Sequence, residues 1–155
     1  MYDLKKHLED LGASKWNEWK ASLANDVIYE EIATHTHVKS ADDYLKIVQR
    51  WKRAFPDLKA TIVNTFMAGD KIFAEIEWEG TQTGPLEGQF GTIAATNKRG
   101  MLKASLFVRT KNDKVVELHH YFDMMTLLAN IGIAPFAGVA AQPAKGGTAT
   151  APRQP

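Results

Sequence analysis

The chain has 155 residues, of which 45% are hydrophobic, and this is enough for one domain with a genuine core. Its 19 basic and 18 acidic residues give a formal net charge of +1, without the basic block that nucleic acid or an anionic membrane would call for. The absence of cysteine excludes disulfides and thiolate chemistry. Because Met1–Lys6 lacks the apolar core of a signal peptide and no stretch approaches the ~20 apolar residues of a membrane span, we expect a cytoplasmic protein.

Helical patterns dominate the first third of the chain. Leucines recur at helical spacing over residues 4–12, and Ser14 is a candidate cap for a second helix that carries Trp16, Trp19 and Leu23. A short strand follows at 27–29. The segment Ser40–Asp43 has the cap and acidic residues of a helix start, and one apolar face then continues as far as Pro56.

After Pro56 the hydrophobic period changes from helical to two. The pattern predicts strands over 60–68, 72–78, 102–110 and 115–124, turns at 68–71 and 111–113, a glycine-rich loop over 80–91 and a short helix over 125–131. This order predicts an α+β fold in which a curved antiparallel sheet wraps around the N-terminal helices, as a cone with an internal pocket. We expect one domain over residues 1–140 and a flexible tail over 141–155, where Ala, Gly, Pro, Gln and Thr dominate.

The segment Val115–Met124 combines two histidines, a tyrosine and a carboxylate with an apolar run. On a strand, Glu117, His119, Tyr121 and Asp123 share one face, and Val116, Leu118, His120 and Phe122 share the other. If the first face lines an apolar cavity, His119 and Asp123 form a general acid–base pair. The alternative is a polar face that meets water.

Five short motifs follow one another in the chain: Phe55–Leu58, the turn Gly80–Gly84, Lys114–Glu117 running into Asp123, Leu127-Leu128 and Ile131-Gly132. In this order, over roughly Asp26 to Ile133, they resemble the SnoaL-like polyketide cyclases of the nuclear-transport-factor-2-like and ketosteroid-isomerase-like superfamily. The resemblance implies a cone-shaped fold, an aspartate at position 123 as the general acid–base, and an aldol ring closure without metal or cofactor. The chain departs from the family pattern at Gln82, at His119 and in the loop Ala94–Gly100.

An intramolecular aldol reaction needs a group that removes a proton beside a carbonyl and protonates the new alkoxide, and a buried Asp with a raised pKa can do both. We therefore predict Asp123 and His119 as catalytic. A hydrophobic or aromatic substrate would be held by flat or polar side chains, namely Trp51, Phe55, Trp78, Phe90, Tyr29, Tyr121 and His35, although aromatic residues are also ordinary core residues.

Other classes of function stay open. An epoxide hydrolase or epoxide-opening cyclase would use Asp123 with a second group such as Tyr29, and a non-catalytic binding protein would use the same pocket. His35 and His37 could join Glu30 or Glu31 in a zinc site, but no fourth ligand is placed, and we predict no metal. Arg109 pairs with a carboxylate or a substrate anion, or is a surface charge.

The outer face of the predicted sheet suggests association. It would carry Phe73, Phe107, Val63 and Met67 among charged residues, which is more apolar surface than a monomer usually shows. We therefore expect a homodimer through the sheet.

Overall fold

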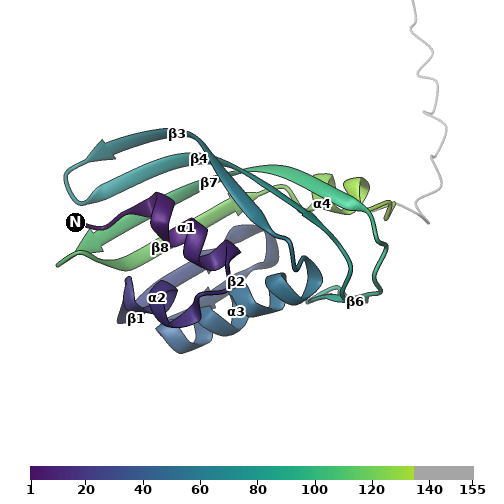
Figure 1. Ribbon diagram of the computed structural model, residues 1–155, viewed down its shortest axis with the longest axis horizontal. Helices are drawn as coiled ribbons and strands as arrows, with labels where there is room; N and C mark the ends of the chain where they lie inside the picture. The colour runs from purple at the N-terminus through teal and green to yellow at the C-terminus, as the bar shows by residue number, and fades with distance from the viewer. Residues whose placement is uncertain (135–155) are drawn as a thin grey trace, which may run out of the picture.

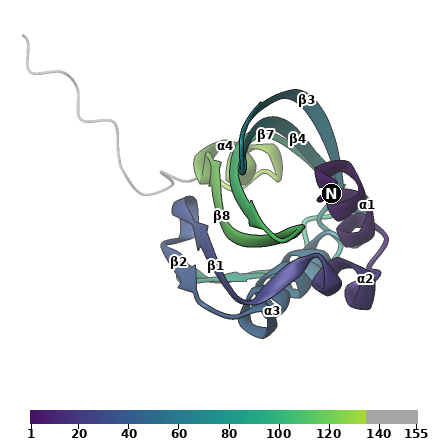
Figure 2. The ribbon, with the colours of Figure 1, turned by 90° about the vertical axis from the view of Figure 1, so that its left-hand side faces the viewer.

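The computed structural model describes residues 1–134, in which a strongly curved sheet curls around a central space and helices close its open side (Figures 1 and 2). The main sheet has the strand order β2-β1-β8-β7-β4-β3. Its strands are β1 (Leu23–Glu31), β2 (Thr36–Val38), β3 (Lys59–Ala68), β4 (Lys71–Thr81), β7 (Arg99–Lys111) and β8 (Lys114–Phe122). The helices are α1 (Leu4–Gly12), α2 (Trp16–Ala21), η1 (Ile32–Thr34), α3 (Ala41–Ala54) and α4 (Met124–Asn130). The expected tail, 141–155, lies outside the described residues.

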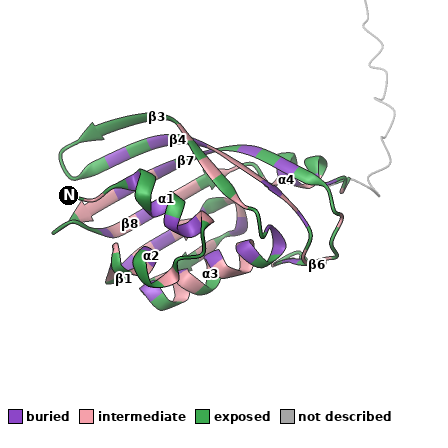
Figure 3. Cartoon of the chain, in the orientation of Figure 1, coloured by how far each residue is buried: buried purple, intermediate pink, exposed green. Residues whose placement is uncertain are grey.

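Helix α3 follows its sequence pattern closely. Ser40 is the N-cap, and its hydroxyl accepts a hydrogen bond from the Asp43 amide at 3.1 Å. Tyr44 and Val48 are buried, and the helix ends at Ala54, just before Pro56. The alternation of buried and exposed positions along the helix appears in Figure 3.

Helices α1 and α2 pack over the open side of the curved sheet. Leu4, Leu8 and Leu11 are buried, as the spacing predicts. In α2 the Trp19 side chain is fully buried, but the expected cap is wrong: Ser14 has a positive φ of 56° and the N-cap is Lys15. Leu23, expected in this helix, is the first residue of β1.

Two hairpins confirm the predicted turns. Strands β3 and β4 are joined at Gly69-Asp70, and β7 and β8 at Asn112-Asp113, whose φ angles are both positive, as a tight hairpin turn requires. Along β4, Ile72, Ala74 and Ile76 are buried, and Phe73 and Glu75 between them are exposed. A further small hairpin, β5 (Leu86–Gly88) with β6 (Gly91–Ile93), begins in the predicted loop 80–91 and extends two residues beyond it.

The sheet is mixed, not wholly antiparallel as expected. Strand β1 pairs parallel to β8, and in this register Glu31 lies beside His120. Directly paired neighbours share a face of the sheet, so this pairing brings the end of the first strand and the last strand together inside the cone. None of the helices within residues 1–134 is long and apolar enough to cross a membrane.

Candidate active site

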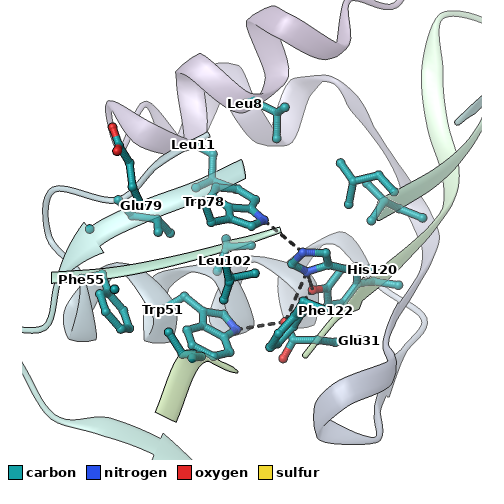
Figure 4. Close-up of a pocket in the computed structure, with 18 of the residues that line it drawn as sticks. Leu8, Leu11, Glu31, Trp51, Phe55, Trp78, Glu79, Leu102, His120 and Phe122 are labelled. Atoms are coloured by element: carbon teal, nitrogen blue, oxygen red, sulfur yellow. Dashed lines mark hydrogen bonds and ion pairs between the residues drawn. The ribbon is translucent and has the colours of Figure 1, made fainter. Parts of the chain in front are cut away.

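A pocket occupies the inside of the curved sheet (Figure 4). Its cavity volume is about 70 Å³. Its lining is mostly apolar and comes from α1, α3, α4 and the strands β1, β4, β7 and β8: His7, Leu8, Leu11, Tyr29, Glu31, Tyr44, Val48, Trp51, Phe55, Leu58, Trp78, Glu79, Gly80, Gly100, Leu102, Leu106, Leu118, His120, Phe122 and Leu127. Such a cavity, with few polar groups converging in it, suits a small hydrophobic molecule.

His120 is the central polar group of this pocket. It points inwards from β8 between Leu118 and Phe122, which lie on the same face of the strand. The indole N–H of Trp78 donates a hydrogen bond to His120 Nε2 at 3.1 Å. Because Nε2 accepts this bond, the imidazole proton is on Nδ1, which faces the Tyr29 hydroxyl oxygen at 3.4 Å.

Glu31 is fully buried behind His120, with its Oε2 3.9 Å from His120 Nδ1. Three donors satisfy the carboxylate: Tyr29 Oη at 2.7 Å and Trp51 Nε1 at 2.9 Å to Oε2, and Thr34 Oγ1 at 2.7 Å to Oε1. Burial alone raises the pKa of Glu31, but the interaction with His120 and the hydrogen bonds from Tyr29 and Thr34 outweigh it and hold that pKa below its ordinary value. Glu31 is therefore an anion in the core.

Together these groups form a connected set. The His120 imidazole lies in an apolar pocket, the Trp78 indole N–H contacts its unprotonated nitrogen, and the buried Glu31 carboxylate lies behind its protonated nitrogen. In proteins such a carboxylate orients an imidazole and stabilises the imidazolium that forms when the ring takes up a proton. The arrangement can therefore move a proton to and from a bound molecule.

The structure places the predicted lining residues in two groups. Tyr29, Trp51, Phe55 and Trp78 line the pocket, and the first two also bind Glu31. The others lie elsewhere: Phe90 is 46% exposed on the β5–β6 hairpin, Tyr121 is 45% exposed on the outer face of β8, and His35 follows η1 in a left-handed conformation.

The expected position of Asp123 in the cavity is wrong. Asp123 is the N-cap of α4, where its carboxylate accepts hydrogen bonds from the Met125 amide at 2.9 Å and the Thr126 hydroxyl at 2.6 Å. These bonds lower the pKa of Asp123, whereas an acid–base role needed a raised one. It is exposed and does not line the pocket.

His119 is likewise on the opposite face of β8 from the pocket. Its Nε2 lies 3.0 Å from Glu117 Oε1, and its ring packs against Phe107 on the outer surface of the sheet. Arg109 binds Glu117 on the same surface, at 2.8 Å, so it pairs with a carboxylate, one of the roles left open for it. The predicted alternation holds from Glu117 to Phe122, and the more apolar of the two faces turns inwards. At Val116, expected on the face of Leu118, a bulge interrupts the register, and Val115 is the buried residue.

Two site residues were not predicted. His120 stood between Leu118 and Phe122 on the apolar face of the strand, and that pattern was a usable signal for a polar group inside a core. Glu31 gave no such signal, because only the parallel register of β1 with β8 places it beside His120. Within residues 1–134 no cluster of three His, Asp or Glu side chains is arranged to hold a metal ion, and His37 instead contacts Glu30 at 2.9 Å.

Comparison with known proteins places this fold. Among solved structures, a Catenulispora acidiphila protein with a ketosteroid-isomerase-like fold, in complex with trimethylamine, has a TM-score of 0.69 at 16% identity, covering 81% of this chain and 88% of its own. IdmH from Streptomyces antibioticus, a candidate polyketide cyclase, has a TM-score of 0.69 at 19% identity, covering 81% and 93%. An LEH-like epoxide hydrolase from M. tuberculosis has a TM-score of 0.61 at 13% identity, covering 80% and 82%.

At these identities the structural neighbours show the fold alone, and no curated protein matches the sequence significantly. The sequence model of one family does match, over residues 4–131, which is most of the chain. The cone of α1–α4 and the curved sheet agrees with that match. The chain belongs to the SnoaL-like polyketide cyclase family.

Proposed function

We propose that this protein closes a ring in a hydrophobic or aromatic small molecule by an intramolecular aldol-type reaction, with His120 as the acid–base group. The observation that carries the proposal is the position of His120: its Nε2 faces an apolar pocket and accepts a hydrogen bond from Trp78, while the buried Glu31 lies behind its other nitrogen. This assigns to His120 the role that the sequence suggested for Asp123 and His119.

The reaction begins when a substrate carbonyl enters between Trp78 and His120. The carbonyl oxygen takes over the indole N–H, and the carbon beside it presents a C–H bond to His120 Nε2. Transfer of that proton gives an imidazolium and an enolate, whose oxygen is stabilised by the Trp78 N–H. The enolate carbon then attacks a second carbonyl of the same molecule, and His120 returns the proton to the new alkoxide.

Glu31 and Tyr29 support the charged intermediate. Tyr29 donates its hydroxyl hydrogen to Glu31, so its oxygen is free to accept from His120 Nδ1. The negative charge of Glu31 stabilises the imidazolium across this short chain of contacts. Because Trp51 and Thr34 also donate to it, the carboxylate stays fixed during the proton transfer.

Deuterium exchange tests this chemistry without the natural substrate. 2-Acetylnaphthalene, an aromatic methyl ketone, would be incubated with the protein in D₂O, and the loss of its methyl proton signal would be followed by NMR. We expect the wild-type chain to catalyse the exchange and His120→Gln to slow it at least about 100-fold, the usual contribution of a general base. His119→Gln, one residue away on the outer face, is the matched control and should leave the rate unchanged.

Asp123→Asn separates this proposal from the sequence-based one. Asn still caps a helix, so the fold should persist. Exchange that disappears in Asp123→Asn and persists in His120→Gln would contradict the role proposed for His120 and support Asp123 instead.

Epoxide opening is the alternative within the same pocket. It needs a protonated acid to assist the epoxide oxygen, and the lowered pKa of Glu31 argues against that group as the acid. Hydrolysis of styrene oxide with no deuterium exchange would favour the epoxide hydrolase; binding of aromatic compounds with neither reaction would favour a binding protein.

A further inference from the structure

His7, on α1, lines the same pocket but takes no part in the proposed proton transfer. Only 2% of its surface is exposed. Its Nδ1 lies 2.8 Å from Ser22 Oγ, and the Ser22 hydroxyl donates its hydrogen to the carbonyl of Trp19 at 2.7 Å. Ser22 Oγ must therefore accept from His7, which places the ring proton on Nδ1 and leaves Nε2 as an acceptor.

His7 Nε2 is buried and has no hydrogen-bond partner within residues 1–134. Burial lowers the pKa of His7 to about 4, against the opposing effect of Asp10, so the ring is neutral at neutral pH and Nε2 keeps its lone pair. The neighbouring Tyr2 hydroxyl and Trp19 indole N–H are also unpartnered in this part of the chain, but neither residue lines the pocket. A buried acceptor without a partner loses the hydrogen bond that water would give it, and a ligand that donates to it would restore that bond.

A series of ring contacts leads from His7 to His120: His7 packs on Trp19, Trp19 on Tyr44 and Tyr44 on Tyr29, whose hydroxyl lies 3.4 Å from His120 Nδ1. Ser22, the partner of His7, accepts a hydrogen bond from the Val115 amide at the start of β8. His120 is five residues further along that strand, which is roughly 16 Å of extended chain. Aromatic rings form the wall along this stretch, and Tyr29 and Tyr44 stack there with centroids 3.9 Å apart.

We propose that His7 Nε2 accepts a hydrogen bond from a hydroxyl, most simply a phenol, at the end of an elongated fused-ring or aryl substrate, away from its reacting carbon. The inference rests on the proposed function, because it takes the reacting carbon to lie at His120. His7 would then fix which end of the molecule enters first and so which carbonyl reaches His120. It is a positioning residue and takes no proton.

A pair of probes tests this assignment: 2-naphthol, which donates a hydrogen bond, and 2-methoxynaphthalene, which cannot. His7→Asn keeps an N–H near the position of Nδ1 for Ser22 and has nothing where Nε2 lies. In calorimetric titrations, the His7→Asn variant should bind 2-naphthol about tenfold more weakly than the wild type does, which corresponds to a loss of roughly 1.4 kcal/mol in binding free energy. The affinity of the variant for 2-methoxynaphthalene should stay within about twofold of the wild-type affinity. His7→Gln, which can place an acceptor near the position of Nε2, should recover most of the affinity for 2-naphthol.

A measurement on the unmodified chain guards against a variant that fails to fold. In ¹⁵N-histidine-labelled protein, 2-naphthol should move the His7 Nε2 resonance and 2-methoxynaphthalene should not. Equal affinity for the two probes, with a stationary Nε2 resonance, would overturn the inference and leave the role of His120 standing. If neither probe binds, the inference is also overturned, and the deuterium exchange of 2-acetylnaphthalene decides separately on His120.

Discussion

At the scale of single residues, Glu31 is the most deeply buried of the Asp, Glu, Lys and Arg side chains within residues 1–134. A charge is tolerated in a core only when donors surround it, and Tyr29, Thr34 and Trp51 supply them. The Trp51 indole N–H can only donate a hydrogen bond, so the orientation of this ring depends on the acceptor that Glu31 provides. Glu31 therefore links helix α3 to strand β1 as well as supporting His120.

Replacing Glu31 by Gln should destabilise the fold and slow proton transfer together. The amide offers one acceptor oxygen where three donors converge, so we expect the free energy of unfolding to fall by about 1–3 kcal/mol. Urea denaturation measures this change. Glu30→Gln, the next residue on the exposed side of β1, is the control and should change stability by less than about 0.5 kcal/mol. Equal effects of the two substitutions would contradict the network described here.

The buried His7 should make stability depend on pH. Its pKa is lowered to about 4 in the folded chain, so between the ordinary value of 6.5 and about 4 the unfolded chain binds a proton that the folded chain does not. Stability therefore falls as the pH falls through this window. Each pH unit removes up to about 1.4 kcal/mol, and the total approaches about 3 kcal/mol.

Urea denaturation at pH 7, 6 and 5 tests this dependence, and His7→Asn should remove most of it. Glu31 affects stability in a lower pH range than His7 does. Because its pKa is lowered in the folded chain, its contribution is present above its ordinary value of 4.5 and is lost as the pH falls further. A stability that stays level from pH 7 to 5 in the wild-type chain would show that His7 is not buried as a neutral ring.

At the scale of elements, the connection from β4 to β7 depends on Gln82, which is fully buried. Its amide N–H groups reach the carbonyls of Gly84, Ile93 and Ala94, and its oxygen accepts from the amide and hydroxyl of Thr96. One side chain thus holds both ends of the segment that carries the β5–β6 hairpin. Gln82, one of the positions at which the chain departs from the family pattern, therefore has a structural role.

Gln82→Leu should loosen this segment without dissolving the sheet. The carbonyls that lose their donor would need water, so residues 82–98 should open to solvent. Hydrogen–deuterium exchange with mass spectrometry should report at least about tenfold faster exchange there and little change in β7 and β8. Thr83→Val, at the neighbouring exposed position, is the control. Unchanged exchange in Gln82→Leu would mean that other contacts hold the segment.

The sequence predicts a helix or strand well when the residues that determine it are close together in the chain. Helix α3 could be predicted almost to the residue, because its cap, its apolar face and its stop at Pro56 are neighbours in the chain. Strand β1 was expected only over 27–29, because Asn25-Asp26 reads locally as a break although pairing extends the strand from Leu23. The site could not be predicted in this way, because it depends on the pairing of β1 with β8. The alternation along a strand also shows which residues share a face, but it does not show which face turns inwards.

At the scale of the whole molecule, the outer surface of the sheet carries a row of aromatic side chains. Phe66 pairs with Phe73 across β3 and β4, and Phe73 with Phe107 across β4 and β7, with ring centroids 5.1 Å apart for the second pair. Phe66 is 66% exposed and Phe73 is 49% exposed. Met67, expected on this surface, pairs with Ile72 and so lies on the opposite face.

We propose that this row is the centre of a homodimer interface. A monomer usually exposes less contiguous apolar surface than this row of aromatic side chains provides. Two-fold pairing of identical chains is the commonest way to bury such a surface. Light scattering at micromolar concentration should give twice the chain mass, and Phe73→Glu should give the monomer mass. Phe90→Glu, at an exposed aromatic residue away from the sheet, is the control. A wild-type monomer would contradict the proposal.

The parallel pairing of β1 with β8 has a consequence for the order in which the molecule is made. Tyr29 and His120 are 91 residues apart in the chain, and Glu31 meets His120 only through that pairing. A ribosome therefore delivers the carboxylate long before the imidazole, and the nascent chain holds an incomplete cone until its last strand emerges. Closing so long a loop is slow, so the contact between Glu31 and His120 forms only once β8 has paired with β1.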